Sequence, residues 1–157
     1  MGRVAGLPTA AITNDSALGG QIIDGSLTFN KVSENDGSYL TRTPSTGGSR
    51  NRFTLSVWLK RNGNLGSWQR IIAASPGGND ISALAFRGDG NTDGLRIQMQ
   101  YSGVNKHWSS SGKFRDSSGW YHIVMAVHLY ASAGERVRVY RNGVRDYGSW
   151  VTGTEPD

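Results

Sequence analysis

The sequence contains no cysteine, which excludes a disulfide framework and any metal site built on thiolates. Proline is limited to 4 of the 157 residues, and no apolar run approaches the length of a membrane-spanning helix. No segment shows the apolar spacing of an amphipathic helix. The first residues lack a basic stretch followed by an apolar one, so we expect no signal peptide. These absences favour a globular chain built from strands.

Carboxylates in a catalytic pattern are also scarce. Retaining glycosidases hold two carboxylates about 5–5.5 Å apart, and alternating acids on one strand provide such a pair. The three glutamates, Glu34, Glu135 and Glu155, fall in expected turns or in the tail. No Gly-x-Ser-x-Gly elbow is present. We therefore expect a protein that is not an enzyme, and a glycanase fragment is the least favoured alternative.

Positive charge is in excess without being clustered. The 17 Lys and Arg residues outnumber the 12 Asp and Glu residues, which gives a net charge of +5. Because the basic residues are scattered singly, we expect neither a nucleic-acid nor a membrane partner. The three histidines show no metal-site spacing, and His122 is expected to pack within a sheet.

The clearest structural pattern runs from Gly119 to Tyr147. Residues 120–129 are apolar on both faces, which is typical of a strand in the middle of a sheet that is covered on both sides. Residues 136–141 alternate between valine and polar side chains, and Asn142-Gly143 then predicts a type I′ hairpin turn. The side chains expected on the core face of the first strand are Tyr121, Ile123, Met125, Val127 and Leu129.

Short strands at regular spacing fill the rest of the chain. The 22 glycines and the polar turns between these strands predict an all-β fold, an antiparallel β-sandwich or jelly roll. Residues 1–25 are expected to form an extended N-terminal arm, either a disordered tail or a segment lying on a neighbouring subunit. Further strands are expected at residues 26–30, 38–42, 53–61, 69–75, 81–87 and 95–101, with a short one around His107-Trp108.

Several of these segments, in this order, resemble concanavalin A-like, laminin-G-type jelly-roll domains of the kind found in structural proteins of tailed bacteriophages. The resemblance covers about residues 26–150 and rests on residues 26–30, 39–45, 53–61, 120–124 and 140–143. Such domains continue past the hairpin into further strands, whereas this sequence stops at Pro156-Asp157. We therefore expect residues 26–157 to be a sandwich that lacks its final strands, through truncation or because the arm or a partner supplies them.

Aromatic side chains at strand ends or in loops are candidates for stacking on sugar rings. These are Trp108, Trp150, Tyr147 and Trp68. For Trp108 and Trp150, packing in the core or an interface is an equally open alternative, and for Trp58 and Trp120 it is the favoured one. Six side chains are expected to share the non-core face of one sheet: Trp58, Arg96, Gln98, Gln100, Arg138 and Tyr140.

Asp89, Asn91 and Asp93 match the start of a calcium loop, Asp-x-Asn-x-Asp-Gly. The twelfth position is Gln100 instead of glutamate, and a strand follows instead of a helix. A hairpin turn explains the same residues. We expect no cofactor, with calcium as the alternative.

The resemblance implies a virion structural module, such as a decoration or fibre protein located in the virion. Its partners would be other virion proteins and further copies of itself, in a homo-oligomer. The alternative is a lectin-like, carbohydrate-binding domain that recognises a host polysaccharide. The two functions are compatible in one protein, because the fold alone does not separate them.

Overall fold

The computed structural model describes residues 27–29, 31–33, 36–61, 68–77, 80–87, 93–153 and 155–156. The chain divides into two units, Met1–Thr46 and Gly47–Asp157. In the first unit, β1 (Lys31–Ser33) pairs antiparallel with β2 (Asp36–Gly37). The expected N-terminal arm, residues 1–25, lies outside the described residues.

The strands predicted at residues 26–30 and 38–42 are wrong as far as the structure describes them. Residues 27–29 and 38–42 are not in a strand. In a strand, the adjacent residues Tyr39 and Leu40 would point to opposite faces, so one of them would face a core. Both side chains are instead exposed. Local apolar content therefore does not produce a strand here.

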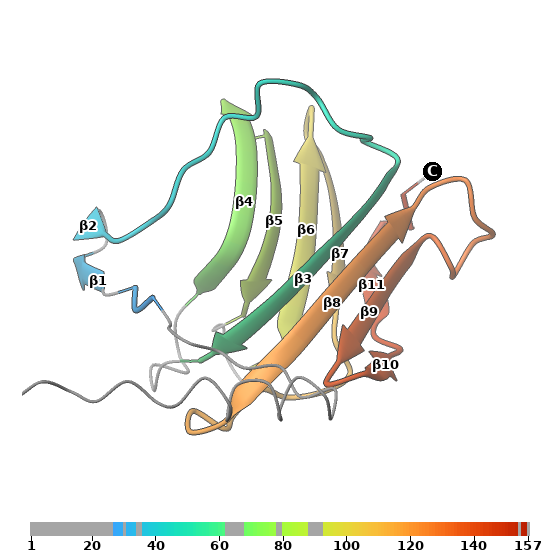
Figure 1. The fold of residues 1–157 in the computed structure, drawn as a ribbon. Helices are drawn as coiled ribbons and strands as arrows, with labels where there is room; N and C mark the ends of the chain where they lie inside the picture. Colours follow the sequence, from blue (N-terminus) through green and yellow to red (C-terminus); the bar gives the residue numbers. More distant parts are fainter. Residues whose placement is uncertain are drawn as a thin grey trace, which may run out of the picture. The chain divides into compact units, whose positions relative to one another are not determined.

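The second unit consists of two antiparallel sheets, which Figure 1 shows as two layers. One has four strands, in the order β10 (Val144–Asp146), β9 (Val137–Arg141), β8 (Trp120–His128) and β3 (Arg52–Lys60). The other has five, in the order β11 (Ser149–Thr152), β7 (Val104–Ser109), β6 (Leu95–Tyr101), β5 (Asp80–Phe86) and β4 (Gln69–Gly77). The all-β sandwich is confirmed. None of the described residues forms a helix that could cross a membrane.

Alternate residues of β8 form the centre of the core, as the period of two predicted. Tyr121, Ile123, Met125 and Val127 are buried, and Leu129 packs partly buried against them. Val137 and Val139 of β9 extend this apolar layer. The opposing sheet contributes Leu84, Phe86, Leu95, Ile97 and Trp108.

The second face of β8 differs from the expectation. The strand does lie inside its sheet, between β9 and β3. However, Trp120 is 40% exposed, and His122, Val124, Ala126 and His128 are only half-buried. Neighbouring strands cover the edges of a strand and not its outward face, so a central position does not bury both faces.

The Asn142-Gly143 hairpin is confirmed. Both residues have positive φ, 50° and 79°, as a type I′ turn requires. The turn also binds back to β8: the Asn142 N–H donates to the carbonyl of His122 at 2.8 Å, and the His122 N–H donates to Asn142 Oδ1 at 2.8 Å. The hairpin therefore extends the hydrogen bonding of β8 and β9 up to His122.

The loop before β8 supplies one core residue that the sequence pattern did not predict. Phe114 is fully buried, with its ring centroid 5.2 Å from Phe86 and 5.0 Å from Tyr121. Its carbonyl accepts a hydrogen bond from Arg61 Nη1 at 2.8 Å. Arg61 is itself buried, which lowers its pKa, while the charge of Asp93 acts in the opposite direction.

Candidate functional site

The outward side chains of β3, β8 and β9 form one continuous surface on the four-stranded sheet. The strand register places them in rows across the sheet. The rows are Trp58 with His122, then Ser56 with Val124 and Tyr140, then Thr54 with Ala126 and Arg138, then Arg52 with His128. Lys60 and Trp120 form a further row at the Trp58 end. These residues are termed the outer surface.

One end of the outer surface is aromatic. The rings of Trp58 and His122 are stacked, with centroids 4.8 Å apart and planes at 10°. Ser56 Oγ lies 2.9 Å from His122 Nε2, and this hydrogen bond fixes the orientation of the imidazole. Trp58 is 38% exposed and Trp120 is 40% exposed. Because Trp120 pairs with Lys60, it is a diagonal neighbour of Trp58 across the strands.

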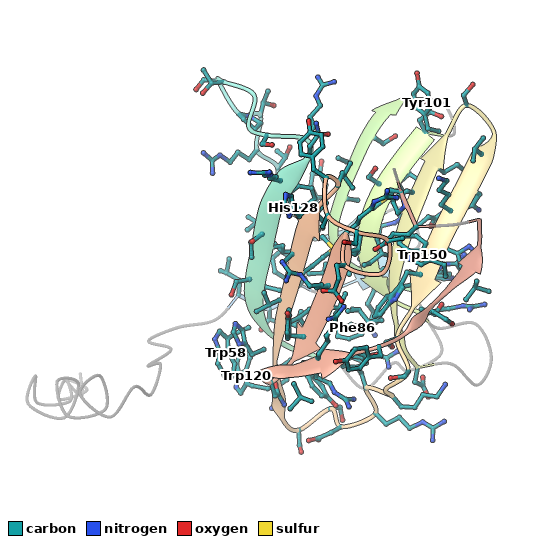
Figure 2. The ribbon with its side chains drawn as sticks, turned by 90° about the vertical axis from the view of Figure 1, so that its right-hand side faces the viewer. Trp58, Phe86, Tyr101, Trp120, His128 and Trp150 are labelled. Atoms are coloured by element: carbon teal, nitrogen blue, oxygen red, sulfur yellow. The ribbon has the colours of Figure 1, made fainter. Side chains whose placement is uncertain are left out.

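Figure 2 shows Trp58 and Trp120 at the same end of β3 and β8, with His128 at the other end. Trp58, Trp120 and His122 are termed the tryptophan platform. Sequence reasoning assigned both tryptophans to packing contacts. The signal was nevertheless present, since Trp58 stands among Thr54, Ser56 and Lys60 on the polar face of an alternating strand.

A tight turn positions Trp120 where β8 begins. Asp116 Oδ1 accepts hydrogen bonds from the Ser118 N–H at 2.8 Å, the Ser118 hydroxyl at 2.6 Å and the Gly119 N–H at 3.1 Å. The Ser118 hydroxyl makes the largest contribution to lowering the pKa of the Asp116 carboxyl. The Asp116 N–H donates to the Tyr121 hydroxyl at 3.1 Å, which ties the turn to a core residue.

Glycine at position 119 of this turn leaves room for the Asp116 carboxylate. A Cβ there would lie 2.5 Å from Asp116 Oδ2, which is closer than such contacts allow. The missing side chain at Gly119 therefore lets the carboxylate fold back over the backbone just before Trp120.

The other end of the outer surface is basic. A shallow hollow is lined by Arg52, Thr54, Ala126, His128 and Arg138, together with Phe53 and Val127. The Arg52 guanidinium lies 5.5 Å from the centroid of the Tyr130 ring. Arg138 Nε and His128 Nε2 are buried without a hydrogen-bond partner among the described residues. None of the described residues that line the hollow is acidic.

Two of the four aromatic residues predicted to bind sugar belong to the interior. Trp108 is 5% exposed, because β7 lies inside the five-stranded sheet and its ring faces the core. Trp108 does lie near the end of β7 (Val104–Ser109), but its ring is buried and is not available on the surface. Trp150 pairs with Trp108 in the strand register and packs partly buried against the same core.

The other two predicted aromatic residues are more exposed and lie outside the strands. Tyr147 follows β10, and the Arg145 guanidinium lies 4.8 Å from its ring centroid. Trp68 precedes β4, and the Arg96 guanidinium lies 5.3 Å from its ring centroid. The structure therefore does not bring the four predicted residues together into one platform.

The six polar and aromatic residues expected on one face are also separated. Trp58, Arg138 and Tyr140 belong to the four-stranded sheet, whereas Arg96, Gln98 and Gln100 belong to β6 of the other sheet. Alternation along a strand predicts which residues of that strand share a face. It does not predict which strands share a sheet, and this is the reason for the error.

The predicted calcium ligands are described only at Asp93. Its carboxylate accepts a hydrogen bond from Arg115 Nε at 2.9 Å and lies 3.6 Å from Arg61 Nη1. Asp89 and Asn91 lie outside the described residues. Among the residues that are described, no group of three or more His, Asp or Glu side chains is arranged to hold a metal ion. The Asp93 carboxylate, which is the described candidate calcium ligand, is therefore already paired with two guanidinium groups.

Comparison with known proteins bears on the fold. A family model described as the concanavalin A-like lectin/glucanases superfamily matches residues 33–157. The chain belongs to this superfamily. No curated protein and no solved structure gives a significant match. Membership confirms the jelly-roll resemblance, and because the superfamily is named for both lectins and glucanases, it does not choose between binding and hydrolysis.

Proposed function

We propose that this domain binds carbohydrate without catalysis, through the tryptophan platform. The observation that carries the proposal is the pair of half-exposed indoles, Trp58 and Trp120, on one face of one sheet. Sugar C–H faces stack on aromatic rings, and a few well-placed polar groups fix the orientation of a ligand. Lys60 stands in the same row as Trp120, and Ser56 lies one row beyond Trp58.

The absence of catalysis is supported by the carboxylates near this surface. β3, β8 and β9 contain no acidic residue. Asp116 is held in its turn by three hydrogen bonds, and the Glu135 carboxylate pairs with Arg145 Nη2 at 2.7 Å. A glycosidase needs an acid and a second carboxylate facing each other across the substrate. These strands therefore offer a binding surface without the groups that hydrolysis requires.

Titration of the intact chain against a panel of bacterial surface polysaccharides tests this proposal. We expect Trp58→Ala and Trp120→Ala each to weaken binding about tenfold or more, because each removes one stacking surface. Trp68→Ala is the matched control, since Trp68 is a comparably exposed tryptophan on the other sheet. Equal affinities for all three variants and the parent protein would contradict the proposal.

A second candidate function is that of a virion structural module that assembles through protein contacts. Two nine-residue strands, β3 and β4, stand at the ends of their sheets. Phe53 on β3 is 44% exposed, and Ile72 on β4 is 51% exposed. Long edge strands with exposed apolar residues favour pairing with another chain. The phage context itself rests on the resemblance of the sequence.

A further inference from the structure

The basic hollow lies on the same surface as the tryptophan platform. Thr54 and Trp58 are four residues apart on β3, which corresponds to about 13 Å along an extended strand. Ser56, Val124 and Tyr140 occupy the row between the two ends. The outer surface therefore runs without interruption from an aromatic end to a cationic end, along β3 and β8 (Figure 2).

The positive charge of the hollow is not neutralised by the described residues. Neither Arg52 nor Arg138 forms an ion pair there. Glu135 is close enough for the charge of Arg138 to contribute to its low pKa, but the main cause is its hydrogen bond from Arg145. Its carboxylate is committed to Arg145, whose pKa is raised in turn. The two arginines thus remain available to an anion from outside.

Two buried nitrogen atoms at this end also lack partners. A buried donor without an acceptor costs about 1–3 kcal/mol. Arg138 Nε is such a donor within the described structure, and His128 Nε2 beside it is also without a partner. A carboxylate or sulfate in the hollow has several acceptor oxygens, and arginine binds such groups through paired hydrogen bonds. An oxyanion is therefore the ligand chemistry that fits this end of the surface.

We propose that the outer surface binds an acidic polysaccharide, whose sugar rings stack on Trp58 and Trp120 while a carboxylate or sulfate group is held by Arg52 and Arg138. This inference rests on the proposed carbohydrate-binding function and specifies its ligand class. Charge alone would also attract nucleic acid, but phosphate-backbone binding would draw mainly on the arginines and need no stacking platform. Binding that depends on both the arginines and the tryptophans therefore distinguishes an acidic polysaccharide from nucleic acid.

The experiment compares four probes by calorimetric titration of the intact chain. The probes are a neutral dextran, dextran sulfate, a polyuronate and a double-stranded DNA oligonucleotide. The variants are Arg52→Gln, Arg138→Gln and Trp58→Ala. Arg70→Gln is the matched control, because it removes the same charge from an exposed position on the other sheet. Circular dichroism and thermal unfolding establish that every variant is folded.

We expect the polyuronate or dextran sulfate to bind at least about tenfold more tightly than dextran, with the difference shrinking as salt rises. Arg52→Gln and Arg138→Gln should remove most of this preference, Trp58→Ala should weaken binding of every polysaccharide, and Arg70→Gln should change little. Preference for one acidic polymer over the other identifies carboxylate or sulfate as the recognised group.

Three results would overturn the inference, and each has a separate meaning. If neutral polysaccharides from the panel bind through Trp58 and acidic ones bind no better, the carbohydrate function stands and the acidic ligand class is wrong. If no polysaccharide binds, the proposed function itself is wrong. If DNA binds as tightly as the acidic polymers and Trp58→Ala has no effect, the hollow is a general anion site.

Discussion

The rings of Trp58 and His122 stack 4.8 Å apart on neighbouring strands, and His122 Nε2 is also held by a hydrogen bond with Ser56 Oγ. This arrangement keeps the indole in one orientation on the outer surface. Pre-orientation matters for a weak ligand such as a sugar, because ordering a side chain on binding costs free energy. In the proposed function, His122 is therefore a positioning residue for Trp58.

Replacing His122 should weaken carbohydrate binding without removing a sugar contact. Aromatic pairs contribute about 0.5–1.5 kcal/mol, so we expect His122→Ala to lower affinity by about 2- to 12-fold. His122→Phe restores an aromatic ring and should recover most of the loss. Calorimetric titration measures the affinities, and tryptophan fluorescence reports the mobility of Trp58. Equal losses in the Ala and Phe variants would show that stacking is not the cause.

The Asp116 turn predicts a specific dependence of stability on pH. The pKa of Asp116 in the folded protein is lower than its ordinary value of 3.8, chiefly because the Ser118 hydroxyl donates to the carboxylate. The stabilisation is therefore fully present above the unfolded pKa and is lost as pH falls through the folded pKa. The stabilities of the parent protein and of Asp116→Asn in denaturant unfolding should differ at about pH 6, and the difference should shrink as the pH falls below the ordinary pKa of 3.8.

A second carboxylate provides the control for this pH effect. Glu135 also has a lowered pKa, chiefly because of its hydrogen bond from Arg145. The difference in stability between the parent protein and Glu135→Gln should therefore also shrink at low pH. The two effects should add, because the groups lie in separate turns. A constant gap between the parent protein and Asp116→Asn at all pH values would contradict the assignment.

Phe114 predicts a large loss of stability from a residue in an irregular loop. Its ring is enclosed by Phe86 and Tyr121, and the Arg141 guanidinium lies 5.2 Å from its centroid. Phe114→Ala should lower the free energy of unfolding by about 3–5 kcal/mol, as measured by denaturant titration. Phe53→Ala, at a residue that is 44% exposed, should cost clearly less. Similar losses would mean that Phe114 is not part of the core.

The sequence predicted those features that depend on local pattern. Alternation identified Ile123 and Met125 as core residues, and the tolerance of Asn142 and Gly143 for positive φ identified the hairpin. Phe114 was not predicted, because one apolar residue in a polar loop has no periodicity. The burial of Trp108 was left open as one of two alternatives, because it depends on which strands flank β7 and on the sheet that covers it.

The candidate site illustrates the same limit more sharply. Trp58 and Trp108 both occur in strands that contain polar residues, yet one faces solvent and the other the core. Whether a side chain faces solvent or the core depends on the order of strands in the sheet and on the layer packed against it. The sequence of one strand does not contain these long-range properties. The sequence therefore predicted exposed aromatic residues, but two of those it named, Trp108 and Trp150, pack against the core.

The exposed edge strands lead to a prediction about assembly. If the domain associates through β3, Phe53→Lys should shift it towards the monomer, because a lysine on an edge strand opposes pairing with another chain. Ile72→Lys makes the same test for β4. Sedimentation equilibrium over a range of protein concentrations measures the effect. Tyr101→Lys is the control, since Tyr101 is an exposed aromatic residue on β6, an interior strand. A parent protein that is monomeric throughout, or equal dissociation by Tyr101→Lys, would remove support for self-assembly through these strands.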